Sequence, residues 1–248
     1  MLEPIEQATG APRIDEQAIV ERITAAVMEQ RLPHGTKLTE TALCQVFGVG
    51  RMRVRRALLL LANQDIVALH SNRGAFIASP GQDEARDVFE ARHAIEPDIV
   101  RLAVERATDQ DIAGLEEHLR LESVARAEPT RRDAIRLSGE FHVCLAEATR
   151  NRVLTRLARE LVARTSLIIG LFGGIGLSSC PENEHAGILA AIKAKDAGLA
   201  ISRIRDHLTH IETGLNLNAG GDGQVDIRTV LAEGVVGTNS LEAVNDDP

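Results

Sequence analysis

The sequence predicts a mainly α-helical protein with two domains: a small N-terminal domain of helices and one β-hairpin, and a larger C-terminal antiparallel bundle made only of helices. Aromatic residues are 2% of the chain and hydrophobic residues are 44%, so the core must be aliphatic. Abundant Ala and Leu favour helices over strands. The segment Ser79-Pro80-Gly81 has the residue types of a boundary and separates the hairpin from the helical bundle.

The first helix is expected to begin at Asp15. Ile19, Ile23 and Val27 recur at every fourth position, which places them on one apolar face of a helix. The segment Pro33-His34-Gly35 is expected to end this helix, because proline and glycine both interrupt helical structure.

Two further helices are expected on either side of a tight turn. Thr39 is a suitable N-cap for a short second helix that buries Leu43 and Phe47. The turn Gly48-Val49-Gly50 follows, and a third helix is expected over residues 51–63. The inward side of this third helix would consist of Val54, Ala57, Leu58 and Leu61.

Two short β-like segments come next, at Ile66–His70 and Ala75–Ala78. The intervening Ser71-Asn72-Arg73-Gly74 has the residue types of a hairpin turn. The order helix, helix, turn, helix, hairpin describes a winged helix-turn-helix, which we expect over residues 15–80.

The remainder of the ordered chain is expected to be helical. Breaks are expected at Glu128-Pro129, at Gly173-Gly174-Ile175-Gly176 and at Cys180-Pro181. These helices would form one all-helical domain over residues 81–218. They are expected at residues 82–106, 108–127, 131–149, 151–170, 182–195 and 197–217.

Charge is distributed unevenly along the chain, whose formal net charge is −8. Residues 17–80 hold eight Lys or Arg against four Asp or Glu, whereas residues 81–248 hold 19 against 28. A basic unit joined to an acidic one indicates two tasks, and the basic unit is suited to phosphate binding. The two ends, residues 1–14 and 219–248, are polar and expected to be mostly disordered.

Several classes of protein are excluded by composition. No run of 18 apolar residues is present, so neither a membrane span nor a membrane partner is expected. The acidic start lacks the apolar run of a signal peptide. Cys44, Cys144 and Cys180 are far apart and form no CxxC pair, which is typical of a reducing compartment. We therefore expect a cytoplasmic protein.

Four arginines lie in the first six residues of the third helix. A helix fits the major groove of DNA, and arginine can bind guanine through two hydrogen bonds. Recognition helices read bases from their N-terminal end, which assigns base contacts to Arg51, Met52 and Arg55. Arg53 and Arg56 flank that face and suit phosphate contacts.

The hairpin tip adds Arg73 and Gly74 to these candidates, because glycine lets the chain come close to a DNA backbone. An arginine-rich helix can also be no more than a solvated surface. The turn, the helix and the hairpin together favour double-stranded DNA as the partner.

Residues 17–80 resemble the N-terminal domain of the GntR family of transcription regulators. In that family, arginines at the positions of Arg51 and Arg55 and a glycine at the position of Gly74 contact DNA, so the resemblance implies the same contacts here. The matching runs are Leu38-Thr39-Glu40-Thr41-Ala42-Leu43, Phe47-Gly48-Val49-Gly50-Arg51, Val54-Arg55-Arg56-Ala57-Leu58, Leu61 and Arg73-Gly74.

Two positions depart from the family pattern. Gly50 stands where the family usually has Ser or Thr, which removes a helix N-cap and a phosphate contact. Asp65 stands where the family usually has glycine, at a helix end that is expected to need a positive φ; aspartate tolerates that conformation better than most residues. Both changes affect the choice of operator rather than the fold.

Three histidines lie on three different expected helices, where a bundle can bring them together: His142, His185 and His207. Neutral imidazole is a common ligand of zinc and other divalent metals. Spacing alone is a weak indication, because the chain has eight histidines and no tight motif such as HExxH. Isolated histidines are more often surface or core residues, so both interpretations stay open at this point.

The surroundings of these histidines resemble the FCD ligand-binding domain of the FadR-like GntR subgroup, over residues 86–217. The resemblance implies an antiparallel helical bundle in which three histidines and one aspartate hold a divalent metal, zinc or similar. In that subgroup, the metal and an arginine bind a small organic acid. The matching runs are Glu140-Phe141-His142, Asn151-Arg152-Val153-Leu154, Glu184-His185-Ala186-Gly187-Ile188 and His207-Leu208.

This resemblance assigns effector binding to Arg92 and Glu96 of the first FCD helix, together with Ser138. The aspartate position, four residues before the first histidine, is occupied by Ser138. Because a hydroxyl is a poorer ligand than a carboxylate, three alternatives stay open: a metal held by three histidines and water, weak metal binding, or no metal. Arg92 can also pair with Glu96 on an exposed face without binding a ligand.

Together, the two resemblances imply a DNA-binding regulator, most commonly a repressor, that binds a palindromic operator as a homodimer. A small organic acid in the helical domain would change the spacing of the two recognition helices and hence operator affinity. Two alternatives are a C-terminal domain that only dimerises and a metal-dependent enzyme built on the three histidines. No carboxylate is evidently paired with these histidines in the sequence, which argues against the enzyme.

Overall fold

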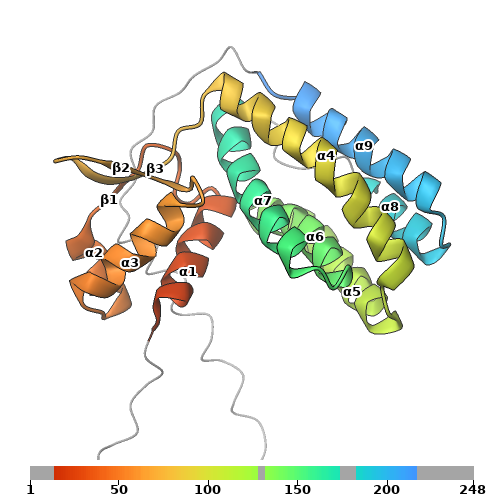
Figure 1. Cartoon of the computed structure of the whole chain (residues 1–248), viewed down its shortest axis with the longest axis horizontal. Helices are drawn as coiled ribbons and strands as arrows, with labels where there is room; N and C mark the ends of the chain where they lie inside the picture. Colours follow the sequence, from red (N-terminus) through yellow and green to blue (C-terminus); the bar gives the residue numbers. More distant parts are fainter. Residues whose placement is uncertain (1–13, 128–131, 174–182, 217–248) are drawn as a thin grey trace, which may run out of the picture.

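The computed structural model describes residues 14–127, 132–173 and 183–216, which form two domains side by side (Figure 1). Three helices and a small sheet make up the N-terminal domain, and the second domain contains only helices apart from one isolated β-bridge. The predicted fold class is confirmed. The disorder expected of residues 1–14 and 219–248 falls outside the described residues, except for residue 14.

The N-terminal domain has the predicted order of helices with a three-stranded antiparallel sheet, in strand order β1-β3-β2. The sequence predicts the β2-β3 hairpin but not β1, because two residues are too few to show an alternating pattern and β1 pairs with a distant strand. The helices and strands are α1 Glu16–Met28, β1 Lys37–Leu38, α2 Glu40–Phe47, α3 Arg51–Ala62, β2 Val67–His70 and β3 Gly74–Ile77.

Local capping explains where these helices begin and end. The side chains of Asp15 and Thr39 accept hydrogen bonds from backbone N–H groups three residues later, at 2.8 and 3.3 Å. Gly48 ends α2 in a left-handed conformation with φ 64°. Gly50 precedes α3 without a side-chain cap, and Asp65 after α3 has φ 54°. The predicted positive φ at Asp65 is thus confirmed.

An aliphatic core fills the N-terminal domain between its helices and its sheet. Ala163 and Leu167 of the second domain belong to the same apolar cluster, so the two domains share a packed boundary. Completely or almost completely buried members of this core include Ile19, Ile23, Leu43, Val54, Leu61 and Ile77.

The second domain is an antiparallel bundle in which α4 packs beside α9 and α6 beside α7 (Figure 1). Predicted helix ends agree with the observed ones to within four residues. Among the described helices, none has both the length and the apolar character needed to cross a bilayer. The helices are α4 Gln82–Arg106, α5 Asp109–Ala127, α6 Arg132–Ala148, α7 Arg152–Phe172, α8 Glu184–Lys193 and α9 Ala197–Thr213.

Candidate functional site

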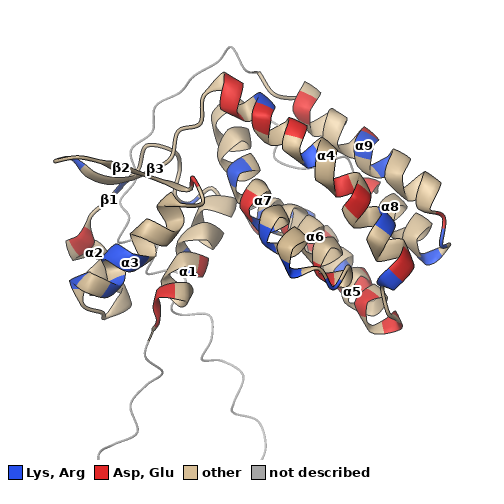
Figure 2. Cartoon of the chain, viewed as in Figure 1, with Lys and Arg blue, Asp and Glu red and all other residues tan. Residues whose placement is uncertain are grey.

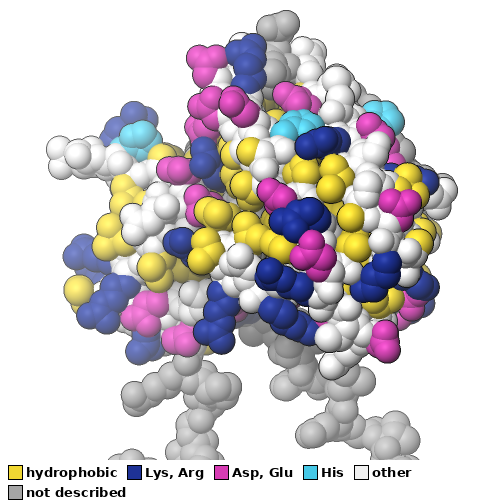
Figure 3. Space-filling model, turned by 45° about the vertical axis from the view of Figure 1, so that its right-hand side comes forward, with side chains coloured by type: hydrophobic (Ala, Val, Ile, Leu, Met, Phe, Trp, Pro, Cys, Tyr) yellow, Lys and Arg dark blue, Asp and Glu magenta, His cyan; other side chains and the backbone are white. Residues whose placement is uncertain are grey.

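Helix α3 buries one apolar face and exposes most of its arginines. Arg51 and Met52 are exposed, and the side chains of Arg55 and Arg56 are 57% and 68% exposed. Lys and Arg gather on this helix in Figure 2 and at the outer edge of the N-terminal domain in Figure 3. The buried residues of α3 are those predicted: Val54, Ala57, Leu58 and Leu61.

Carboxylates of α1 and α2 lie beside these arginines. Glu40 Oε1 is 2.8 Å from Arg55 Nε, and Glu16 Oε1 is 3.5 Å from Arg56 Nη1. Arg53 donates from Nη1 to a backbone carbonyl at 3.0 Å and lies 3.9 Å from the same Glu16 oxygen. Arg53 is therefore held against the start of α1, while Arg55 and Arg56 extend further into solvent.

The hairpin tip supplies the other two candidate contacts. Arg73 and Gly74 are exposed, and Gly74 has φ 96°, a conformation that L residues rarely adopt. The guanidinium carbon of Arg73 lies 5.9 Å from the centroid of the Phe76 ring. The residues predicted to contact DNA thus belong to α3 and to the tip of the β2-β3 hairpin.

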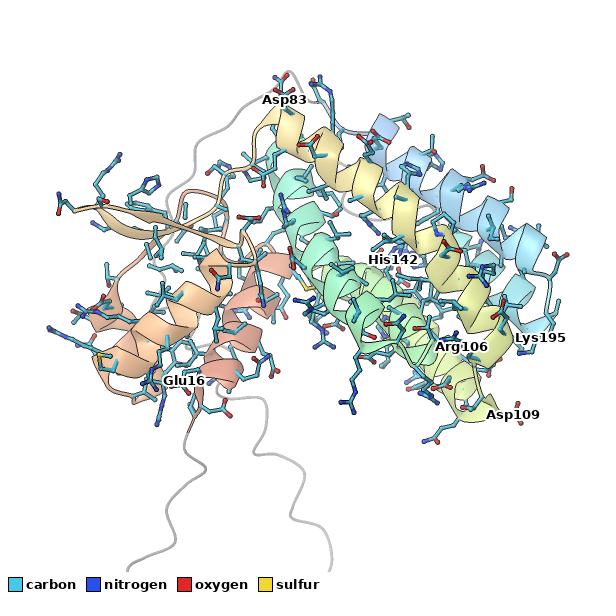
Figure 4. The ribbon with its side chains drawn as sticks, in the orientation of Figure 1. Glu16, Asp83, Arg106, Asp109, His142 and Lys195 are labelled. Carbon is cyan, nitrogen blue, oxygen red and sulfur yellow. The ribbon has the colours of Figure 1, made fainter. Side chains whose placement is uncertain are left out.

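The structure brings the three predicted histidines together inside the second domain. His142 of α6, His185 of α8 and His207 of α9 are each at most 3% exposed. Nε2 of His207 is 3.1 Å from Nε2 of His142 and 3.3 Å from Nε2 of His185. Figure 4 shows His142 inside the bundle. Helix packing therefore creates a cluster from residues far apart in sequence.

Each of these histidines meets a carboxylate through its other ring nitrogen. The carboxylates come from α4, α5 and α8, and the histidines come from α6, α8 and α9. Five helices therefore contribute to the site. The distances from Nδ1 to the nearest carboxylate oxygen are 2.7 Å for His142 and Glu96, 3.0 Å for His185 and Glu122, and 2.7 Å for His207 and Glu184.

The sequence interpretation that no carboxylate pairs with the histidines is wrong. Glu122 and Glu184 were not among the predicted site residues. Glu184 directly precedes His185 but pairs with His207, and Glu122 lies 63 positions away from its partner His185. The inward helical position of Glu122 is the one signal that could have drawn attention to it, since charged residues are rarely buried unless paired.

Burial and neighbouring charges set the protonation of this network. Burial lowers the pKa of His142 to about 3, which outweighs the attraction of Glu96. Burial would raise the pKa of Glu96, but Arg92 and His142 hold it far below its usual range. Burial likewise opposes the ionised form of Glu122, yet His185 and a neighbouring arginine lower its pKa to about 2. These carboxylates are therefore ionised at neutral pH, and His142 is neutral.

The resulting proton positions fit a divalent cation. An ionised carboxylate only accepts hydrogen bonds, so Nδ1 of each histidine carries a proton. In neutral His142, Nε2 therefore has a lone pair. Histidines that bind metals usually donate their other N–H to a carboxylate in this way. In tetrahedral zinc sites, Zn–N bonds of about 2.1 Å separate the ligand nitrogens by roughly 3.4 Å, close to the observed separations of 3.1 and 3.3 Å.

Arg92 is buried beside this cluster with 2% exposure. Its Nε donates to Glu96 at 2.5 Å and its Nη1 to Thr165 at 3.3 Å. The alternative of an exposed pair of Arg92 and Glu96 is therefore wrong. Within the described residues, Nη2 of Arg92 is buried and has no hydrogen-bond partner. A buried unpaired donor is costly, and a guanidinium group binds carboxylates strongly.

Ser138 lies one helical turn before His142 on α6 and is 8% exposed, so it occupies the buried position expected for the family's aspartate. Glu140 is engaged elsewhere, because its carboxylate accepts a hydrogen bond from Arg136 at 2.7 Å. The protein therefore offers a neutral hydroxyl at this position, and Glu140 does not replace the missing carboxylate.

Two further histidines of the helical domain, His118 and His210, lie outside the cluster. His118 Nε2 lies 2.8 Å from the backbone oxygen of Leu137, which indicates a structural role. His210 is exposed and shares the carboxylate of Glu184 with the cluster, at 2.7 Å. His210 therefore supports a residue that orients the cluster, a link that its sequence context does not reveal.

Comparisons with known proteins cover both domains. Residues 16–77 match the family described as bacterial regulatory proteins, gntR family, and residues 87–210 match the FCD domain. The Nta operon transcriptional regulator of Aminobacter aminovorans is 28% identical over 179 residues, which cover 71% of this chain and 85% of that protein.

A second relative and a solved structure agree with these matches. The HTH-type transcriptional repressor RspR of Escherichia coli K12 is 23% identical over 178 residues, 71% of this chain and 78% of that protein. A GntR transcriptional regulator of Rhodococcus sp. RHA1 has the same fold, with a TM-score of 0.69 at 20% identity over 80% of this chain and 95% of that one. The chain belongs to the GntR family of DNA-binding transcription regulators, with an FCD ligand-binding domain, and is not an enzyme.

Proposed function

We propose that this regulator is a repressor that binds a palindromic operator as a homodimer and responds to a small organic acid bound near a divalent metal, zinc or similar. The observation that carries this proposal is the buried cluster of His142, His185 and His207. Their Nε2 atoms converge, and the Nδ1 atom of each ring lies beside a carboxylate. The name of the E. coli relative supports repression rather than activation. Because DNA is the proposed partner of this regulator, we propose that the regulator acts in the cytoplasm.

On the DNA side, Arg51, Met52 and Arg55 are the proposed base contacts. They are exposed at the N-terminal end of α3, where recognition helices approach base edges. Arg53, Arg56 and the hairpin tip, with Arg73 and Gly74, are the proposed contacts to the DNA backbone. A phosphate would replace the carboxylate of Glu16 beside Arg56, and a base edge would replace that of Glu40 beside Arg55.

In the helical domain, His142, His185 and His207 would hold the metal, which would supply a Lewis-acid centre for a carboxylate oxygen. Glu96 orients His142 and also holds Arg92. Arg92 Nη2 offers a donor to an anion beside the cluster. This combination of a cation site and a guanidinium donor favours a small carboxylic acid as the effector.

Ser138 makes the binding of metal and acid interdependent. Because it is neutral, the protein supplies three uncharged nitrogen ligands and no anionic one at the family's aspartate position. The effector carboxylate would provide that charge, so we expect zinc to bind more tightly when a short organic acid such as malonate is present.

Isothermal titration of chelator-treated protein with Zn²⁺ tests the metal site. We expect one zinc per chain, loss of binding in His185→Ala, and tighter binding in Ser138→Asp. His118→Ala is the matched control, because His118 contacts a backbone oxygen outside the cluster. Equal zinc binding by the wild type and His185→Ala would contradict the proposal.

Operator selection from random duplex DNA tests the DNA part. The selected sites should contain two inverted half-sites, and zinc together with the effector acid should weaken binding. Tighter binding on adding the acid would contradict repression relieved by a metabolite. In the alternative of a purely dimerising helical domain, no member of a panel of organic acids would raise the melting temperature of the zinc-loaded protein.

A further inference from the structure

Arg164 of α7 connects the two domains. Its Nη1 lies 3.4 Å from Asp65 Oδ2 in the turn after α3, and its Nη2 donates to Glu84 Oε1 at 2.9 Å in the first turn of α4. The Arg164 side chain is 17% exposed, and its Nε is buried without a hydrogen-bond partner among the described residues. One guanidinium group thus links the end of α3 to two helices of the other domain.

Thr165, the next residue of α7, contacts the proposed ligand site. Its hydroxyl oxygen accepts a hydrogen bond from Arg92 Nη1 at 3.3 Å. Arg92 is joined to Glu96, and Glu96 is joined to His142. A continuous series of contacts therefore runs from the histidine cluster to α7 and ends one residue away from Arg164.

The backbone at Asp65 does not call for a carboxylate. Its φ of 54° is a conformation that glycine adopts without strain, and glycine is the residue of the GntR pattern at this position. In this protein the position is occupied by Asp65, whose carboxylate lies beside Arg164 of the other domain. We propose that Arg164 is a positioning residue that couples occupancy of the histidine cluster to the orientation of α3 through Asp65. This inference rests on the proposed metal function.

A second ion pair crosses the domain boundary and could couple the two domains in place of Arg164. Arg136 Nε of α6 is 3.1 Å from Glu29 Oε1 at the end of α1. Arg136 also pairs with Glu140 and Asp133 of its own helix, so its charge stays compensated when Glu29 is lost. Both carboxylates beside Arg164 come from outside α7, and they are partly exposed, so this contact can open at little cost.

Hydrogen exchange of the full chain, with Zn²⁺ as the probe, tests the coupling. In the wild type, zinc should slow amide exchange in peptides covering residues 59–66 and residues 138–146. Asp65→Asn removes the charge but tolerates the same φ. In this variant the slowing at residues 59–66 should fall about two- to fivefold, the size expected for a partly exposed ion pair, and the slowing at residues 138–146 should persist.

Matched variants separate coupling from a structural role. Asp65→Gly should reduce the response to a similar extent without a lower melting temperature, because glycine relieves the positive φ. Arg164→Gln should reduce it as well, and Arg164→Lys should retain more of it. Glu147→Gln breaks a pair between Glu147 and Arg159 of α7 that stays within the second domain, so its response should equal that of the wild type.

Full slowing at residues 59–66 in Asp65→Asn would overturn the inference, and so would loss of that slowing in Glu29→Gln alone. Zinc-induced slowing confined to residues 138–146 in the wild type would overturn the coupling and leave the metal site in place. No slowing at residues 138–146 in the wild type would overturn both the metal site and the coupling.

Discussion

Arginine is used in opposite settings in the two domains. On α3, Arg55 and Arg56 are 57% and 68% exposed and lie beside partly exposed carboxylates, whereas Arg92 is 2% exposed and bonded to Glu96 and Thr165. Exposed ion pairs contribute about 0–1 kcal/mol, so the α3 arginines can exchange carboxylates for DNA groups at little cost. Removing one partner of a buried pair costs about 3–5 kcal/mol.

The difference indicates what each domain can bind. A large polyanion such as duplex DNA can meet the exposed arginines only from outside. The buried network admits only a small ligand, and its groups are already oriented before that ligand arrives.

The largest effect is expected from the double variant Arg51→Ala, Arg55→Ala. Each base-contacting arginine contributes about 1–3 kcal/mol, so operator binding should weaken by about 2–6 kcal/mol while binding to random DNA weakens less. Fluorescence anisotropy with a selected operator measures this. The control pair Arg152→Ala, Arg156→Ala removes the same charge from an exposed part of α7. Equal losses on operator and random DNA would show that these residues contact only phosphates.

The next effect is expected from Glu122→Gln in the buried network. Without the carboxylate, His185 loses its fixed ring orientation, and zinc affinity should fall about 10- to 100-fold. Competition with a zinc-sensitive dye measures the affinity. Glu117→Gln is the control, because Glu117 lies on the same helix but is exposed and pairs with Arg120. Unchanged zinc affinity in Glu122→Gln would mean that Glu122 does not orient a metal ligand.

Gly139→Ala tests the packing of α6, the helix that carries His142. A Cβ at this position would lie 2.8 Å from a side-chain methyl of Val162 and 3.1 Å from the terminal methyl of Met28 of α1, so the Val162 side chain must shift and Met28 must give way. Overpacking of this kind lowers the free energy of unfolding by about 1–3 kcal/mol. Chemical denaturation measures it. Gly114→Ala on α5 meets nothing within 4 Å and should stabilise the protein; equal effects in both variants would contradict the close packing.

The smallest effect is expected from Gly50→Ser at the start of α3. Gly50 has extended backbone angles and no side-chain cap, so a serine hydroxyl can accept a hydrogen bond from the first turn. The gain should be only a few tenths of a kcal/mol, about the difference between serine and glycine caps. Gly48→Ser, at φ 64°, should destabilise the domain instead. Thermal melting compares them, and a lower melting temperature in Gly50→Ser would contradict the missing cap.

Much of the fold follows from local sequence patterns. The repeats of Ile19, Ile23 and Val27 and the cap at Thr39 predicted the N-terminal helices, and turn residues predicted the hairpin. The choice of His142, His185 and His207 among eight histidines came from resemblance, because their spacing alone contains no metal motif. Neither local pattern nor resemblance could pair Glu122 with a histidine, because its partner His185 lies on another helix 63 positions away.

By itself, the sequence determined the order of helices, the position of the hairpin and the arginine-rich start of α3. Each of these depends on periodicity, capping or turn chemistry within a few neighbouring residues. Only the tertiary structure decided that Arg92 is buried, that three carboxylates orient the histidines, and that Arg164 meets Asp65 across the domain boundary. Those contacts depend on how helices pack, which sets the distance between side chains that are far apart along the chain.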